Sequence, residues 1–141
     1  MNNPAVSITI CRTCRAAGDE RPDPPGAALS RATAAKVAET NAAGSIQVTA
    51  IACLSACSRA CSATVSGDGK FSYVIGGLTP DDAGDLVAFA EAHAASADGI
   101  PPWRARPERI RKNTIARLPP HGTPHPLIER PSAEATPEEA S

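Results

Sequence analysis

Aromatic side chains are scarce in this chain of 141 residues. They make up only 3% of the sequence: two phenylalanines, one tyrosine and one tryptophan. The hydrophobic fraction of 42% therefore depends heavily on alanine, which buries little apolar area per residue. We expect one domain with a modest core. A metal or cluster that cross-links loops would help such a core to stay folded.

Long hydrophobic runs are also missing. No apolar stretch approaches the roughly 18–20 residues that a membrane-spanning helix needs. The opening MNNPAVSITI has neither the charged region nor the long apolar region of a signal peptide. We therefore expect a cytoplasmic protein. Because that compartment is reducing, clustered cysteines there more often bind metal or carry out redox work than form structural disulfides.

The chain has no large excess of charge of either sign. The formal net charge is −1, which gives no nucleic-acid signature. A basic segment nevertheless runs from Arg104 to Arg117, where only Glu108 opposes five arginines and a lysine. We expect this segment to dock an acidic redox partner through electrostatic steering. Trp103 could join that surface, but folding back onto the small core is the interpretation we favour. The sequence predicts no oligomeric state.

Alternating apolar residues and turn signals predict the order β-α-β-β-α. Strands are expected at residues 6–10, 46–51, 62–66 and 71–75, and helices at residues 27–43 and 80–93. Gly67-Asp68-Gly69 predicts a hairpin turn, while Thr79 and Pro80 predict a helix start. The first two strands, joined by a helix, should be parallel. This is an α/β, thioredoxin-like order, with a small sheet flanked by helices.

The composition changes after residue 99. Residues 1–99 are expected to form the thioredoxin-like domain, and residues 100–120 a Pro- and Arg-rich extension that packs on it. A short helix is expected from Pro107 to about Thr114. Residues 121–141 are rich in proline and later in glutamate, which predicts a disordered tail.

Five cysteines form two groups, each placed where a predicted strand ends. Cys11 and Cys14 follow the first strand, and Cys53, Cys57 and Cys61 follow the second. Because the carboxyl ends of parallel strands meet at one edge of a sheet, we expect both groups to form one site. A [2Fe–2S] cluster needs four ligands, typically thiolates. We expect Cys53, Cys57 and Cys11 to bind it, with Cys14 or Cys61 as the fourth ligand.

Other interpretations of the cysteines remain open. Zinc also takes four thiolates, although these spacings do not match a zinc ribbon. Cys11 and Cys14 could instead form a thioredoxin-type dithiol, and inert buried cysteines are the plainest alternative. Nearby arginines (Arg12, Arg15 and Arg59) could offset the negative charge of a thiolate-ligated cluster. His93 is expected to contact a helix end and not to bind metal. No catalytic motif is visible, so we do not expect an independent enzyme.

Several stretches of the sequence carry a family resemblance. They are ICRTCR, ACLSACSRACSATV, FSYVIGGLTPDDAGDLVAFAEAHAASADGIPPWRARPE and IARLPP, within about residues 6–120. They resemble an uncharacterised bacterial family of small predicted metal-binding proteins and, more distantly, the thioredoxin-like [2Fe–2S] ferredoxins. The resemblance implies a thioredoxin-like fold, cysteine ligation of a metal, and a one-electron carrier serving cobalamin or metal-handling metabolism. The first two cysteines are spaced more closely than in those ferredoxins, and Cys61 is additional, which leaves the ligand set open.

Overall fold

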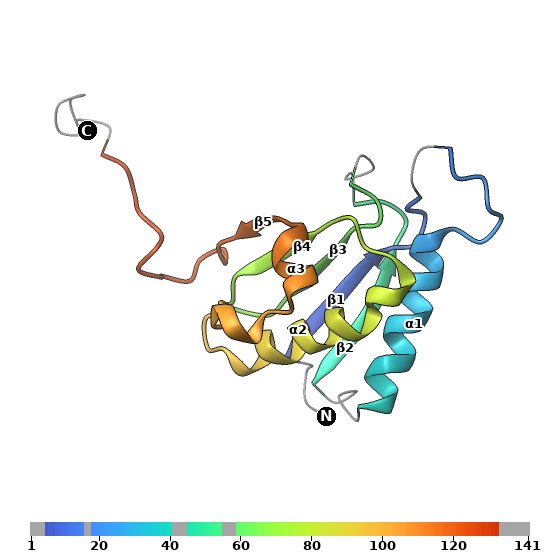
Figure 1. Cartoon of the computed structure of the whole chain (residues 1–141). Helices are drawn as coiled ribbons and strands as arrows, with labels where there is room; N and C mark the ends of the chain where they lie inside the picture. Colours follow the sequence, from blue (N-terminus) through green and yellow to red (C-terminus); the bar gives the residue numbers. More distant parts are fainter. Residues whose placement is uncertain (1–4, 16–17, 41–44, 55–58, 133–141) are drawn as a thin grey trace.

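The computed structural model describes residues 5–15, 18–40, 45–54 and 59–132. Its centre is a five-stranded sheet in the order β2-β1-β3-β4-β5 (Figure 1). The strands are β1 (Val6–Cys11), β2 (Ile46–Ile51), β3 (Ala63–Ser66), β4 (Ser72–Ile75) and β5 (Thr114–Leu118). The helices are α1 (Pro25–Glu39), α2 (Ala83–Ala95) and α3 (Glu108–Asn113), with short 3-10 turns at Pro80–Asp82 and Trp103–Ala105.

The register of the sheet decides which chain segments meet at its edges. β1 and β2 are parallel and pair from Val6 with Ile46 to Cys11 with Ile51. β3 is antiparallel to β1, so that Ala63 at its start lies opposite Ile10 near the end of β1. β4 and β5 continue the sheet with antiparallel pairs. The carboxyl ends of β1 and β2 and the amino end of β3 therefore lie at one edge, which we call the cysteine edge.

The core follows from the alternation of apolar residues along the strands. In β1, Val6, Ile8 and Ile10 are buried, whereas Ser7 and Thr9 between them are half-buried and point to the opposite face. Figure 1 shows α1 and α2 lying side by side across the sheet, and the two helices contact each other. Leu29 of α1 and Leu86 and Phe89 of α2 are fully buried in the same cluster.

The predicted α/β, thioredoxin-like fold is confirmed, with two differences in its elements. α1 begins at Pro25, two residues before the expected start, because proline suits the first helical position. β5 was not predicted at all: the sequence analysis places no strand after residue 75. Its pairing with β4 is a long-range contact that adds an edge strand to the expected sheet. No helix in the described part of the chain is both long and apolar enough to cross a membrane.

Candidate metal centre

The cysteine edge brings together the three segments that carry the described cysteines. The Arg12 amide donates to the Ile51 carbonyl at 2.9 Å, which joins the loop after β1 to the end of β2. The Cys11 amide donates to the Ser62 carbonyl at 3.1 Å, which joins β1 to the segment entering β3. The expectation that loops after two parallel strands would adjoin each other therefore holds for the backbone.

Three buried thiols gather at this edge. Cys11, Cys14 and Cys61 are 2%, 5% and 3% exposed, and none of the three forms a disulfide. The Cys61 thiol donates to the Cys14 carbonyl oxygen at 3.6 Å. Cys53 is exposed just after β2, and the predicted ligand Cys57 lies outside the described residues. Of the five candidate ligands, the structure thus brings Cys11, Cys14 and Cys61 into one buried group.

The close approach of helix α1 keeps the first two thiols in place. The Cys14 amide donates to the Cys11 carbonyl at 3.2 Å, which closes a tight turn, and the Gly26 amide in turn donates to the Cys14 carbonyl at 3.0 Å. A Cβ on Gly26 would collide with the Cys11 carbonyl oxygen and would lie 3.0 Å from the Cys14 nitrogen. Glycine is therefore the residue that lets α1 begin directly against the cysteine turn.

Two hydroxyl groups lie next to the thiols, and the sequence analysis did not single them out. The Thr13 hydroxyl is 3.6 Å from Cys11 Sγ, and it also donates to the Ala52 carbonyl in the loop after β2. The Ser62 hydroxyl is fully buried and lies 3.6 Å from Cys14 Sγ. Thr13 could have been suspected because it lies between two cysteines. Ser62 could not, because the thiol that it contacts is 48 residues away in the sequence.

The surroundings make the two thiols of the first group unequal. Burial acts to raise the pKa of Cys11, but hydrogen bonds from the Thr13 hydroxyl, the Leu54 amide and the Cys14 thiol outweigh it and lower that pKa. Burial also dominates at Cys14, where the hydrogen bonds from Ser62 offset it only partly, so the pKa of Cys14 is raised. Cys11 is therefore the thiol that ionises more readily.

Cys61 is the hardest of the three to ionise in the metal-free chain. Burial, reinforced by the neighbouring charges of Cys14 and Cys11, raises the pKa of Cys61 to about 11. The positive charge of Arg21 acts in the opposite direction. Arg15, which we expected to offset negative charge, instead donates to the Asp19 and Arg21 carbonyls and so shapes the loop that holds Arg21.

The donor chemistry of this group fits a thiolate-ligated metal, although its geometry is not that of a closed ligand set. Soft thiolates suit iron–sulfur clusters and zinc, and three buried thiols from two segments supply them. Within the described ranges, no three cysteine, histidine or acidic side chains are close enough together to hold an ion. Binding would therefore require the thiols to close around the metal together with the loop that carries Cys53 and Cys57.

The other candidate ligand weighed from the sequence lies elsewhere. His93 is fully buried in α2, where its Nε2 is 2.6 Å from the Phe71 carbonyl. Burial lowers the pKa of His93, which favours the neutral ring. The helix end itself is capped by Lys70, whose Nζ donates to the carbonyls of His93 and Ala94 at 3.0 and 2.9 Å. His93 is thus a core residue, away from the thiols.

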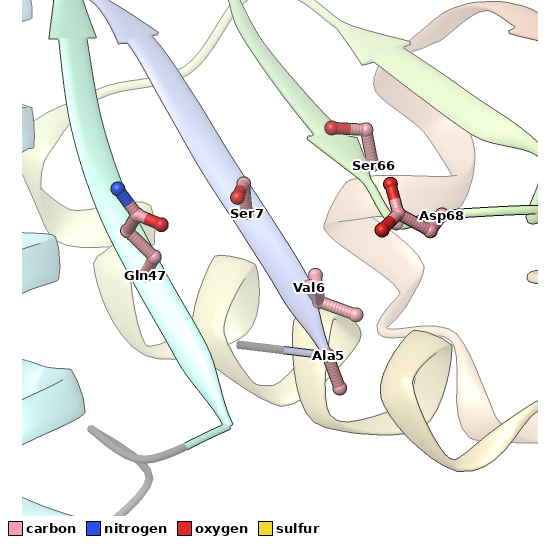
Figure 2. Close-up of a pocket in the computed structure, with 7 residues that line it drawn as sticks. Ala5, Val6, Ser7, Gln47, Ser66 and Asp68 are labelled. Carbon is pink, nitrogen blue, oxygen red and sulfur yellow. The ribbon is translucent and has the colours of Figure 1, made fainter. Parts of the chain in front are cut away.

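Of the hollows that border the described part of the sheet, one adjoins a thiol and another lies at the amino end of β1. A cavity of about 280 Å³ is bordered by Cys61, Arg21, Pro25 and Leu78. The other, of about 380 Å³, lies at the amino end of β1 and is drawn in Figure 2, where the Ser7 and Gln47 side chains come from neighbouring strands. Since Cys11 is at the opposite end of β1, this second hollow belongs to a different part of the sheet.

A family model described as "Protein of unknown function (DUF1636)" matches residues 8–120. The chain belongs to this family. The matched region of this DUF1636 protein contains all five cysteines, together with α3 and β5. A search of curated proteins gives no match.

The solved structures similar to this DUF1636 protein share its fold. A thioredoxin-like [2Fe-2S] ferredoxin from Aquifex aeolicus matches with a TM-score of 0.56 and 16% identity, over 86% of this chain and 99% of that one. A second structure, of the wild-type ferredoxin, matches with a TM-score of 0.52 and 16% identity over 81% of this chain and 99% of that one. A Cys-to-Ser variant of the same ferredoxin matches with a TM-score of 0.51 and 16% identity, over 79% of this chain and 98% of that one. At this identity, the likeness establishes the thioredoxin-like fold.

Proposed function

We propose that this DUF1636 protein binds a metal centre through cysteine thiolates, and that the centre is a [2Fe–2S] cluster used for one-electron transfer. The observation that carries the proposal is the group of three buried thiols, Cys11, Cys14 and Cys61, at the cysteine edge. Buried thiols are usually apolar packing residues, but here they stand beside the end of β2, which Cys53 follows directly. The fold neighbours that are named as [2Fe-2S] ferredoxins support this choice of centre.

Each residue of the site has a separate role in this proposal. Cys11 would hold the metal from the turn after β1, Cys53 and Cys57 would hold it from the loop after β2, and Cys14 or Cys61 would complete the set of four. A bound cluster would supply one-electron chemistry. The protein itself would keep water from the sulfurs through burial, while the Ser62 hydroxyl, 3.6 Å from Cys14 Sγ, would donate a hydrogen bond that adjusts the potential.

A second candidate, a thiol–disulfide oxidoreductase, has one observation in its favour. The pKa of Cys11 is lowered and the pKa of its neighbour Cys14 is raised. A readily ionised thiol beside a protonated one is the arrangement that thiol–disulfide exchange needs. This function leaves the buried thiol of Cys61 without a role, so we place it second. A zinc site without redox chemistry is the third.

The deciding experiment is anaerobic purification followed by visible spectroscopy and assays of iron, acid-labile sulfide and zinc. The proposal predicts a coloured protein with about two iron and two sulfide per chain. Cys11→Ser should abolish the colour, whereas the matched Ser66→Ala variant in β3, which carries no thiol contact, should keep it.

Three outcomes separate the alternatives. A colourless zinc protein that also fails cluster reconstitution would leave metal binding without electron transfer. A metal-free protein whose Cys11 and Cys14 catalyse disulfide reduction would favour the dithiol function. Comparing the metal content of Cys14→Ser and Cys61→Ser then assigns the fourth ligand, because only replacement of a ligand should lower the iron bound.

A further inference from the structure

Trp103, the single tryptophan of the chain, is exposed at the start of the basic segment. It lies in the short turn Trp103–Ala105, and 63% of its surface is accessible. The expectation that it folds back onto the small core is therefore wrong. A core with so few aromatic residues would gain from burying this side chain, so its exposure calls for another explanation.

Two guanidinium groups hold the exposed indole. The Arg111 guanidinium carbon lies 4.7 Å from the centre of the Trp103 ring system, and that of Arg106 lies 5.7 Å from it. Arg106 is also anchored, because its Nε donates to the Pro101 carbonyl at 2.9 Å. Stacking on an aromatic face orders both arginine side chains before any partner arrives. We call Trp103, Arg104, Arg106 and Arg111 the arginine platform.

The cations of the platform have no carboxylate partner in the described part of the chain. Two neighbouring basic residues are neutralised: Arg109 pairs with Asp82 at 3.0 Å, and Lys112 pairs with Glu108 at 3.1 Å. Arg104, Arg106 and Arg111 form no such pair within the ranges that the structure describes. An exposed aromatic ring among arginines that form no ion pair is the composition of a protein-binding hot spot and not of an ordinary solvated surface.

We propose that the arginine platform docks an acidic protein segment, in which carboxylates pair with Arg106 and Arg111 and an apolar side chain covers the indole. Charge complementarity argues for carboxylates as the partner groups, since arginine forks bind them in a bidentate way. A protein segment is favoured over nucleic acid because the whole chain has a net charge of −1, whereas nucleic-acid binding calls for a broad basic field.

The platform is connected to the cysteine edge through the backbone. α3 ends at Asn113, whose carbonyl accepts the Gly76 amide at 2.9 Å, and the adjacent Gly77 amide donates to the Arg59 carbonyl at 2.9 Å. Arg59 lies two residues before Cys61. Figure 1 shows α3 near β4 and β5, toward the edge of the sheet that is farther from α1. That the docked protein exchanges electrons rests on the proposed function, whereas the docking itself does not.

The test uses the full-length chain with fluorescein-labelled octaglutamate as the probe and octaglutamine as its uncharged counterpart. Anisotropy at low salt should show binding of octaglutamate alone, weakened at high salt because ionic screening increases. Docking should also shift the emission of Trp103, which is the only indole. Arg106→Gln with Arg111→Gln should weaken octaglutamate binding about tenfold or more, since two charged contacts are lost.

The control removes two positive charges elsewhere, one of which, Arg31, is paired with Asp23. Arg31→Gln with Lys36→Gln lies on α1, which packs on β1 and β2 near the edge of the sheet opposite β5, and should change affinity less than about twofold. Equal losses in both double variants would overturn the proposal, as would unchanged Trp103 emission on saturation. Stronger binding of a single-stranded RNA of equal charge, lost in the platform variant, would make the surface a nucleic-acid site instead. Circular dichroism confirms that each variant is folded. If the purified protein contains no metal, the proposed function fails, but the peptide-binding test of the platform still applies.

Discussion

The absence of a side chain at Gly26 allows α1 to begin against the cysteine turn. A Cβ at this position would collide with the Cys11 carbonyl and would lie 3.1 Å from Cys14 Cβ. These neighbours are backbone atoms and a buried side chain, so they cannot move aside cheaply. We predict that Gly26→Ala lowers the free energy of unfolding by about 1–3 kcal/mol, measured by urea denaturation, because the site becomes overpacked.

Gly84 provides the matched control for this prediction. It lies in the first turn of α2, and a Cβ there would meet only Lys36 Cε at an ordinary 3.6 Å. Gly84→Ala should therefore stabilise the protein by about 0.4–1 kcal/mol, because alanine restricts the unfolded chain. If both glycine variants shifted stability in the same direction, close packing at the cysteine turn would not be the reason for Gly26.

The Thr13 hydroxyl, 3.6 Å from Cys11 Sγ, is one of the groups that influence how readily Cys11 ionises. Burial acts to raise the pKa of Cys11, and the hydrogen bond from Thr13 is the largest of the influences that lower it. Thr13→Val keeps the shape of the side chain and removes the hydroxyl, so the pKa of Cys11 should rise. We predict slower iodoacetamide labelling of Cys11 near neutral pH in the metal-free protein, followed by peptide mass spectrometry, because the thiolate is the reacting form.

Thr9 serves as the control for Thr13. Its hydroxyl is 2.9 Å from that of Thr49 on the neighbouring strand and contacts no thiol of the described residues. Thr9→Val should leave the labelling rate of Cys11 unchanged. An unchanged rate in Thr13→Val as well would mean that the Leu54 amide and the Cys14 thiol suffice to lower the pKa.

At the scale of elements, one ion pair ties α3 to the start of α2. Asp82 accepts the Thr79 amide at 2.8 Å and Arg109 Nε at 3.0 Å, and Arg109 also donates to the Gly77 carbonyl at 2.7 Å. Burial acts to raise the pKa of Asp82, but the hydrogen bonds from Arg109 and the Thr79 amide outweigh it, so the pKa is lowered. The carboxylate therefore stabilises the folded state when ionised.

The direction of this shift sets the pH dependence. Because the folded pKa of Asp82 is below the unfolded value of about 3.9, its contribution is present above that value and is lost as the pH falls through the folded pKa. We predict that Asp82→Asn lowers the free energy of unfolding by about 0.5–2 kcal/mol at pH 7. The difference from wild type should shrink as the pH is lowered through this range, whereas Asp81→Asn, at an exposed neighbour, should change stability by less than about 0.5 kcal/mol.

The elements also show where sequence reasoning works and where it stops. β1, β2 and the hairpin of β3 and β4 were predicted because local alternation and the Gly67–Gly69 turn mark them. β5 was missed because the strand has only five residues, contains Arg117 and is followed by two prolines. Only its pairing with β4 makes this segment a strand. Long-range pairing leaves little trace in a local pattern.

In the candidate site, too, local patterns were predictable and long-range contacts were not. That Cys11 and the loop after β2 share one edge followed from parallel pairing alone. The burial of Cys61, its contact with the Cys14 carbonyl and the approach of Ser62 to Cys14 depend on how β3 enters the sheet, which no spacing reveals. The ligand roles of Cys53 and Cys57 stay predictions, and so do the cytoplasmic location and the disordered tail.

At the scale of the whole molecule, the proposed centre would connect segments that are far apart in the sequence. Cys11 and Cys14 stand against α1, and Cys61 leads into β3, so a shared metal would cross-link the two halves of the sheet. In a chain with 3% aromatic residues, this link should matter for overall stability. Metal that binds only the folded state stabilises it by mass action, by about 2.7 kcal/mol at one hundred times the dissociation constant.

We therefore predict that removing the metal with a chelator under anaerobic conditions lowers the thermal midpoint by about 5–10 °C, given roughly 2–4 °C per kcal/mol for a chain of this size. Differential scanning calorimetry of the two forms measures the shift. In Cys61→Ser, the metal-dependent shift of the midpoint should be mostly lost if Cys61 is a ligand. The shift should persist if Cys53 and Cys57 supply the remaining thiolates. An identical midpoint with and without bound metal would mean that the centre sits on an already rigid edge, so the small core would have to account for the stability without it.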